Sequence, residues 1–579
     1  MKIRRFRRLF TAIAALALAA VPALAQIDPT VVVESKYNVD LGGIRKPDLP
    51  MAVEDTLRKF DVTFDYSIFN RPYQDLYDFT PFEALQLKPT DAARHPFLYL
   101  KLGCQYPLTP SALVSLQHVS RKGVYFNLYG DHNSFFGDVP SAVSDGMLAL
   151  DRNRNNIGAN FKYAWNVGEL DFGASYSLDR DAYQFPSVSD PSATVNRRTF
   201  GRDALEVFLK LRSASSQSGS IYYAFDARYR NTASRSGLST PVTSIDSLTE
   251  NRLKFSGFVG ATFDVHRVYV DMAIDYASYD DNKNYSIGIV EFAPIYELSR
   301  KAFHAKLGVR FSNRFGLNRA GDSEIADDGN DLTSASAIYP DVDARLELAR
   351  DALWLHAVAG GGQDLNAWSS LASSSPFISP HAPLMMGSRP FDGSLSLESV
   401  ISGRMSFNFV SSYTAYREKP IFVPVTSDSE PCRITARYLD VRRFSAGVDA
   451  LWKSEDLSTG AEFRFNDYKY ITPDYSKAPL ADLPRYTLRT YIRYSWKERV
   501  IASVDFSYRS AVSGAVADGQ CGEYSVPAIC DLDVNLNYKV FRFLTVFVKG
   551  GNLLNMRNQY TPLYVEPGRN VGGGISITL

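Results

Sequence analysis

Charged side chains recur at every second or fourth position in several stretches of this 579-residue chain, with apolar side chains between them. Successive side chains of an extended strand point to opposite faces, so these charges would gather on one face of a sheet. Such a face can line an aqueous path for a solute, or form an ion-pair lattice that supports a wide barrel. Because both signs are mixed, we expect no strongly ion-selective pore. The charges with this pattern are Asp226, Arg228, Arg230, Glu462, Arg464, Arg489, Arg493, Asp505, Arg509, Asp531, Asp533 and Lys539.

Enzyme and metal motifs are missing from the sequence. It contains no G-x-S-x-G, H-E-x-x-H, C-x-x-C, Walker or G-x-G-x-x-G motif, and its seven histidines are scattered. The acidic run from Gly321 to Asp331 offers oxygen atoms that could bind Ca²⁺, but its spacing is not that of an EF-hand. A solvated acidic loop is the expectation there. We therefore predict a non-enzyme without catalytic residues, cofactor or metal.

The four cysteines are candidates for disulfide bonds. Cys521 and Cys530 lie nine residues apart around one predicted connection, and an oxidising exterior favours a pair that closes its own loop. Cys104 and Cys432 are a second candidate pair across the barrel mouth. Sequence alone does not fix the connectivity.

The first 25 residues predict export. Basic residues between Lys2 and Arg8 precede an apolar run and the sequence Ala23-Leu24-Ala25, which together are typical of a Sec signal peptide cut before Gln26. Cleavage removes five basic residues and leaves 58 basic against 63 acidic side chains, a net charge of −5. That balance offers no basic surface to nucleic acid. No later stretch is long and apolar enough to predict a transmembrane helix.

Period-2 alternation recurs through the remaining chain and predicts strands. A β-sandwich would bury the apolar face, whereas an outer-membrane barrel would turn it toward lipid and keep the charges in the lumen. Strands of about ten residues match a tilted crossing of the bilayer. The expected strands lie near 96–105, 111–119, 123–131, 156–164, 168–178, 203–212, 219–230, 252–263, 265–279, 287–298, 302–312, 337–348, 352–361, 392–400, 402–413, 442–453, 457–467, 485–496, 499–509, 530–539, 542–552 and 570–579.

The connections between these strands favour the barrel. Tight polar turns alternate with long segments, as short periplasmic turns alternate with long extracellular loops in bacterial barrels. The long segments include 179–202, 231–251, 314–336, 362–391 and 414–441. We therefore predict an all-β, antiparallel transmembrane barrel of about 22 strands over residues 96–579, in contact with outer-membrane lipid. Leu579 is expected to end the last strand at the periplasmic rim, where that strand closes the barrel.

The last residues resemble a known family. "GNLLNMRNQY" (Gly551 to Tyr560) and the following "VEPGRNVGGGISITL" are similar to the C-terminal end of TonB-dependent receptor barrels. The matching residues are Gly551, Asn552, Leu553, Asn555, Pro567, Gly568 and Arg569. The resemblance implies a 22-strand barrel and energy-dependent uptake of a scarce solute through a plugged lumen.

The N-terminal segment, residues 26–95, departs from that family. "DPTVVVES" resembles a TonB box, with Thr30, Val31, Val32 and Val33 suited to strand addition on a periplasmic energy-coupling protein. The rest is too short and too Pro-interrupted for a standard plug, so we expect a mostly extended periplasmic segment without a full plug.

Three functions remain open: a scaffold or subunit of an outer-membrane transport or assembly complex, an energy-coupled importer, and a passive pore. The short segment favours the scaffold narrowly over the importer. An open lumen would support the pore, and a lumen filled by loops or by residues 26–95 the scaffold.

Overall fold

The computed structural model describes residues 96–120, 123–142, 146–185, 196–213, 221–239, 245–280, 285–316, 335–401, 403–425, 433–471, 484–497, 499–514 and 524–579. The predicted signal peptide, residues 26–95 with Thr30 to Val33, and the acidic run lie outside these ranges. No helix among the described residues is long and apolar enough to cross a membrane.

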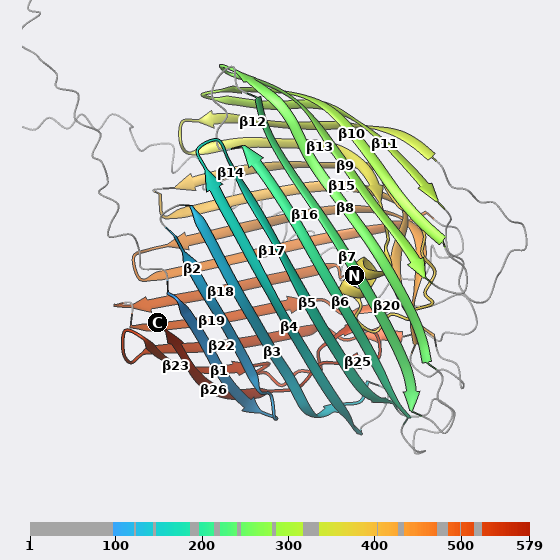
Figure 1. The fold of residues 1–579 in the computed structure, drawn as a ribbon, viewed down its shortest axis with the longest axis vertical. Coiled ribbons are helices and arrows are strands. Elements are labelled where there is room, and N and C mark those ends of the chain that lie inside the picture. The colour runs from blue at the N-terminus through green and yellow to red at the C-terminus, as the bar shows by residue number, and fades with distance from the viewer. Residues whose placement is uncertain are drawn as a thin grey trace, which may run out of the picture. The chain divides into compact units, whose positions relative to one another are not determined.

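Twenty-two strands form one closed antiparallel sheet, which confirms the predicted fold class (Figure 1). Each strand pairs with its neighbours in the chain. The strands are β1 (Leu98–Tyr106), β2 (Ser111–Val119), β3 (Val124–Pro140), β4 (Met147–Trp165), β5 (Gly168–Phe185), β6 (Asn196–Ser213), β7 (Ile221–Ser239), β8 (Ile245–Phe263), β9 (His266–Asp280), β10 (Tyr285–Arg300), β11 (Phe303–Gly316), β12 (Ala335–Ala349), β13 (Leu353–Asp364), β14 (Gly387–Ile401), β15 (Met405–Val425), β16 (Arg433–Lys453), β17 (Leu457–Tyr470), β18 (Tyr486–Trp496), β19 (Val500–Arg509), β22 (Ile529–Lys539), β23 (Leu544–Gly551) and β26 (Asn570–Thr578).

Three short elements lie in connections of the barrel. Helix α2 (Trp368–Ser374) follows β13. The hairpin β20 (Val512–Gly514) and β21 (Tyr524–Val526) follows β19, and the hairpin β24 (Gln559–Thr561) and β25 (Tyr564–Val565) follows β23. All three lie at the end of the barrel that carries the long connections, here named the long-loop end.

The last strand closes the barrel against the first. β26 pairs with β1 along eight residue positions, and Leu98 and Leu579 exchange backbone hydrogen bonds of 3.2 and 2.9 Å. Gly574 lies opposite Gly103 at this seam, where a side chain on Gly574 would collide with the carbonyl oxygen of Leu102. The seam therefore depends on glycine for the close approach of two backbones.

Strand register separates an apolar face from a polar one. Ile492, Val504 and Val534 lie in one cross-strand row, and Leu536 lies on the same face two residues beyond Val534. Tyr491, Asp505 and Asp533 form a row on the opposite face. The first face carries many exposed aliphatic and aromatic side chains, such as Leu536 at 43 % exposure. This apolar face is the one suited to lipid.

Several strands are longer than the alternation predicts. The predicted loop 414–441 is mostly strand, since β15 continues to Val425 and β16 begins at Arg433. The predicted loops 179–202 and 231–251 are likewise mostly strand. Ladder hydrogen bonds continue past the bilayer, where apolar alternation is no longer required, so the side-chain pattern underestimated the strand lengths.

Gly574→Ala should prevent correct closure of the barrel. The new methyl group overlaps the β1 backbone, and overpacking of this kind costs about 1–3 kcal/mol. We expect less protein with the faster gel mobility of an unheated, folded barrel. Gly360→Ala is the matched control, because the nearest atom to its new methyl group is 3.7 Å away. Equal folded fractions for the two variants would contradict the seam argument.

Candidate functional site

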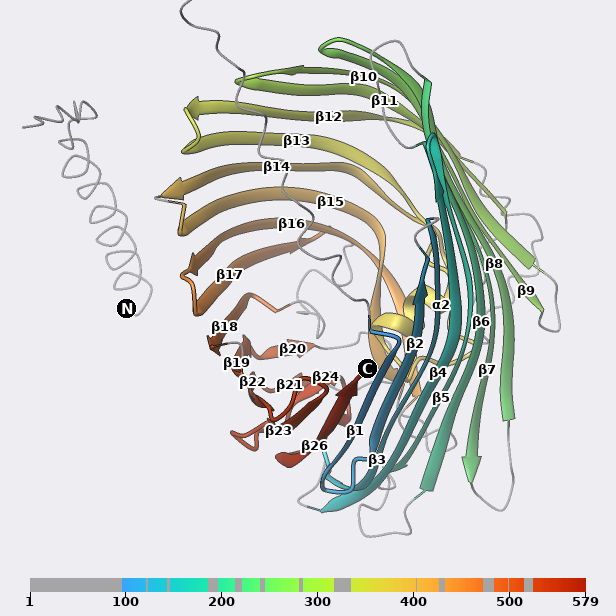
Figure 2. The same cartoon turned by 60° about the vertical axis from the view of Figure 1, so that its left-hand side comes forward.

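An apolar connection folds into the barrel at the long-loop end. This roof segment, residues 365–386, joins β13 to β14 and contains α2, which Figure 2 shows inside the curve of the barrel wall. Trp368 is only 2 % exposed. The segment's other buried apolar residues are Leu365, Ala367, Leu371, Ala372, Phe377, Ile378, Ala382, Leu384 and Met386. The predicted loop 362–391 is therefore an inward-folded element that buries its own apolar side chains.

Bulges in the adjoining strands redirect the chain toward the lumen. The β13–β14 register shifts between Gly360 and Gly362, and the β15 register shifts between Tyr416 and Lys419. At the second bulge Glu418 has a φ of 55°, a conformation uncommon for a residue with a side chain. Bulges bend a strand and re-aim its side chains. Here Glu418 pairs with Arg314 at 3.3 Å, next to the end of the roof segment.

Polar side chains of β6, β8 and β9 hold one side of the roof segment. The backbone N–H of Ser369 donates to Glu250 at 3.1 Å, and that carboxyl is fully buried. The Arg252 guanidinium donates to the Ser370 hydroxyl at 2.6 Å while it pairs with Asp275. In addition, the backbone N–H of Trp368 donates to the Tyr279 hydroxyl, and Arg202 donates to the carbonyl of Ala372.

The other side of the segment is bound to a distant part of the wall. Ser379 N–H donates to the carbonyl of Ile434 in β16 at 2.8 Å, and the Tyr438 hydroxyl donates to the carbonyl of Pro383. β6 and β16 are ten strands apart in a 22-strand sheet. Since nearly half the circumference separates them, the roof segment crosses the lumen.

A second connection meets the roof segment from the closing side of the barrel. This hairpin segment, residues 552–569, contains β24 and β25. Its Tyr564 stacks on Phe377 with ring centroids 3.6 Å apart and an interplanar angle of 9°. Tyr183 of β5 and Phe200 of β6 pack edge-on against this pair. Stacked and edge-to-face aromatic contacts of this kind add to the stabilisation from burial.

A partly buried ion triad fastens the hairpin segment to the wall. Arg152 of β4 pairs with Glu566 at 2.8 Å and with Asp181 of β5 at 3.2 Å. Both strand residues lie beyond the spans expected to cross the membrane. Burial raises the pKa of Asp181, although Arg152 opposes the shift. Burial would lower the pKa of Arg152, but the two carboxylates outweigh it and the pKa is raised.

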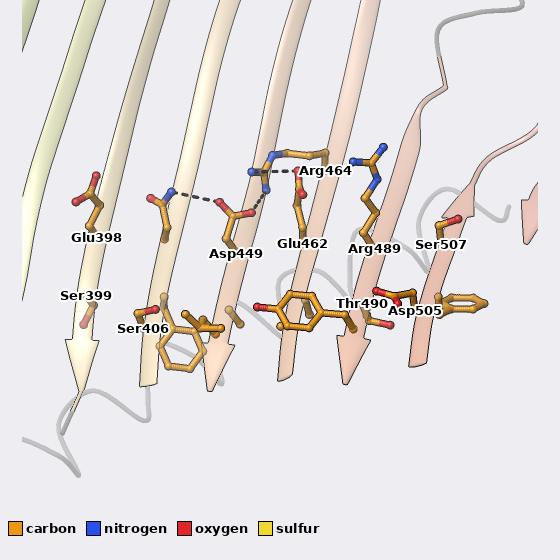
Figure 3. Close-up of a pocket in the computed structure, with 18 of the residues that line it drawn as sticks. Glu398, Ser399, Ser406, Asp449, Glu462, Arg464, Arg489, Thr490, Asp505 and Ser507 are labelled. Atoms are coloured by element: carbon orange, nitrogen blue, oxygen red, sulfur yellow. Dashed lines mark hydrogen bonds and ion pairs between the residues drawn. The ribbon is translucent and has the colours of Figure 1, made fainter. Parts of the chain in front are cut away.

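Two cavities open on the polar face of the barrel. One of about 540 Å³ lies beside the roof segment, between Arg252 and Lys254 of β8 and Glu418 of β15. The other, of about 770 Å³, is the wall cavity shown in Figure 3; it follows β12 to β22 and includes Arg464, Arg489 and Asp505. The barrel therefore contains cavities large enough for solvent or a small solute, although the roof segment crosses its long-loop end.

Most charges on this polar face are paired across strands. Arg310 contacts Glu291 at 2.9 Å and Asp341 at 2.8 Å, and Lys306 also pairs with Asp341. Arg464 pairs with Asp449 at 2.5 Å and with Glu462 at 3.5 Å. Such a network of ion pairs stabilises the barrel wall and keeps its polar face hydrated.

The sequence-predicted charges fall into two groups on the polar face. Arg228 bonds Asp226, and both Arg228 and Arg230 lie within 4.0 Å of Glu206. Glu250 and Arg252 of the neighbouring strand contact the roof segment, so Arg228 and Arg230 lie on the face of the sheet that carries those contacts. Arg489, Asp505, Asp531 and Asp533 line the wall cavity. Arg493 stacks over the Tyr491 ring at 5.0 Å, on the same face.

Two of the four cysteines lie among the described residues. Cys104 and Cys530 are free thiols in the structure. Their proposed partners, Cys432 and Cys521, lie outside the described residues, so both disulfides stay predictions. Within the described ranges, no group of three or more His, Cys, Asp or Glu side chains could hold a metal ion.

The roof segment is the main feature that strand periodicity missed. Its composition gave a signal, because residues 365–386 contain no Asp, Glu, Lys or Arg but include Trp368, Phe377 and Ile378. An uncharged connection with large apolar side chains is unusual for a solvated extracellular loop. Its anchors Glu250, Arg252 and Arg202 could not be found this way, since only the barrel's curvature brings them to the segment.

The fold is similar to that of several solved outer-membrane receptor barrels. The FrpB iron transporter from Neisseria meningitidis (F3-3 variant) aligns with a TM-score of 0.62 at 9% identity, over 83% of this chain and 81% of that chain. The copper transporter OprC aligns with a TM-score of 0.61 at 11% identity, over 83% of this chain and 82% of that chain. The siderophore receptor PiuA from Acinetobacter baumannii aligns with a TM-score of 0.61 at 8% identity, over 84% of this chain and 82% of that chain. No family model and no curated protein matches the sequence. At such low identity the likeness shows the fold, and it supports the barrel implied by the resemblance to TonB-dependent receptors.

Trp368→Ala should loosen the roof segment without unfolding the barrel. Removing the buried indole costs about 3–5 kcal/mol in a packed core. We expect residues 365–386 to lose amide hydrogen-exchange protection while the strands keep theirs. Ser374→Ala, at an exposed position of α2, is the control and should exchange like wild type. Unchanged protection in Trp368→Ala would mean that the indole does not hold the segment.

Proposed function

We propose that the protein is an energy-coupled importer of the outer membrane, in which the roof segment closes the extracellular mouth until a solute is taken up. The observation that carries this proposal is the fixation of residues 365–386 to β6, β8 and β9 on one side and to β16 on the other. A mouth bridged in this way opposes free diffusion. The two cavities on the polar face leave room for a solute to pass when the segment moves.

The two other functions find less support. A passive pore needs an unobstructed path, which the roof and hairpin segments interrupt. A scaffold was favoured by the sequence, and a lumen entered by a loop agrees with it. However, the similar structures named above are transporters and receptors, and a static scaffold has no need of the cavities that remain. We therefore place the importer first and the scaffold second.

Energy coupling is assigned to the N-terminal segment. Thr30 to Val33 form a strand-prone stretch suited to pairing with an exposed sheet edge of a periplasmic energy-coupling protein. Export by the predicted signal peptide would place this stretch in the periplasm. We propose that the energy-coupling protein, by pulling on this stretch in the periplasm, drives passage of the solute.

Removal of the roof should convert the barrel into a leak. We would replace residues 366–385 with a short Gly-Ser linker and measure swelling of liposomes in an oligosaccharide solution. Wild type and Ser374→Ala should swell little, and the shortened protein rapidly. Rapid swelling of wild type would support the pore instead. A shortened protein that stays closed would show that the roof is not the barrier.

Coupling can be tested by co-purification from detergent-solubilised outer membranes. Wild type and Asn38→Ala should retain the periplasmic energy-coupling protein. Val32→Pro should lose it, because proline removes a ladder donor from the added strand. Another outer-membrane subunit retained by all three proteins, without the coupling protein, would favour the scaffold.

A further inference from the structure

The wall cavity is lined by several charges that have no ion pair among the described residues. Arg464 forms ion pairs with Asp449 and with Glu462. Glu462 lies directly opposite Arg489 in the β17–β18 register, but it pairs with Arg464 instead. In Figure 3 no hydrogen bond or ion pair joins Arg489 or Asp505 to the other residues drawn. Charges of both signs therefore face the same cavity without compensating each other.

Strand register fixes how these groups are arranged. Arg489 and Asp531 lie on either side of Ser507 in one cross-strand row. Two strand spacings, about 10 Å, separate the backbones that carry them. Both side chains line the same cavity, so a short solute can reach from one to the other.

The neighbouring row adds negative charge. Asp505 lies directly opposite Asp533, an arrangement of like charges that destabilises a sheet unless a cation lies between them. Asp533 accepts one backbone hydrogen bond, from Asn552 at 3.0 Å, and one oxygen of Asp531 is buried without a hydrogen-bond partner in the described chain. Three carboxylates thus line the same cavity as Arg489, which has no ion pair among the described residues.

We propose that the wall cavity binds a small solute of the basic amino-acid class, with one carboxylate and two ammonium groups. Arg489 receives the carboxylate through a charge-assisted hydrogen bond, while Asp505, Asp531 and Asp533 receive the ammonium groups. The cavity of about 770 Å³ has room for such a molecule. This inference names a substrate class for the proposed importer and rests on it only in that respect.

The test is equilibrium dialysis of radiolabelled L-lysine against the purified full-length protein in detergent. Wild type should bind lysine, and Arg489→Gln and Asp505→Asn should each weaken binding about tenfold or more, as expected for the loss of a charged hydrogen bond. Lys162→Gln and Glu169→Gln are the matched controls, because they break an ion pair far along the wall and should bind like wild type. Absence of lysine binding to wild type, or equal losses in the controls, would overturn the proposal.

Cadaverine, which is lysine without its carboxylate, separates the two halves of the site. It should compete weakly with lysine, and its affinity should fall in Asp505→Asn but not in Arg489→Gln. Competition as strong as that of lysine itself would overturn the role of Arg489. Equilibrium binding in detergent requires neither energy coupling nor roof movement, so this result is independent of the liposome and co-purification tests.

Discussion

Backbone hydrogen bonding in hydrocarbon is the constraint on which the rest of the structure depends. An N–H or C=O group left unpaired in lipid costs several kcal/mol, so a sheet that crosses the membrane must close on itself. Here β26 meets β1, and Leu579 and Leu98 exchange the last hydrogen bonds. Glycines at the seam permit this approach, because Gly574 and Gly103 carry no side chains to separate the strands. Every other feature is built on the resulting ring.

A closed ring of 22 strands encloses more space than its own side chains fill. The protein occupies part of that space at the long-loop end with an uncharged connection. Residues 365–386 bury Trp368 and Phe377 against the wall, and Tyr564 of the hairpin segment completes the packing. Apolar burial supplies the stabilisation, and buried polar contacts from Glu250 and Arg252 fix the position of the segment.

Some charges on the polar face form ion pairs, whereas others have no ion pair among the described residues. In clusters such as Arg310 with Glu291 and Asp341, the charges form ion pairs with one another. They are therefore less available to bind a charged ligand. Arg489 and Asp505 line the wall cavity and have no ion pair among the described residues. Unpaired charges beside open volume can bind a solute. Passage through a membrane protein also requires that the solute be released, so this binding must be weak.

The sequence by itself determined the barrel. Alternation such as Leu532, Val534 and Leu536 against Asp531, Asp533 and Asn535 is local, because side-chain direction in a strand depends on position alone. The same rule is enough to assign Arg489 and Asp505 to the polar face of their strands. Only the tertiary structure decided the mouth and the cavity. Strands β4, β15 and β16 extend past the periodic signal, since ladder pairing outlasts the membrane that imposes apolar alternation. The contacts of Ser369 with Glu250 and of Ser379 with Ile434 join residues separated by 119 and 55 positions in the chain. Curvature of the closed sheet brings such residues together, and no local pattern in the chain encodes that curvature.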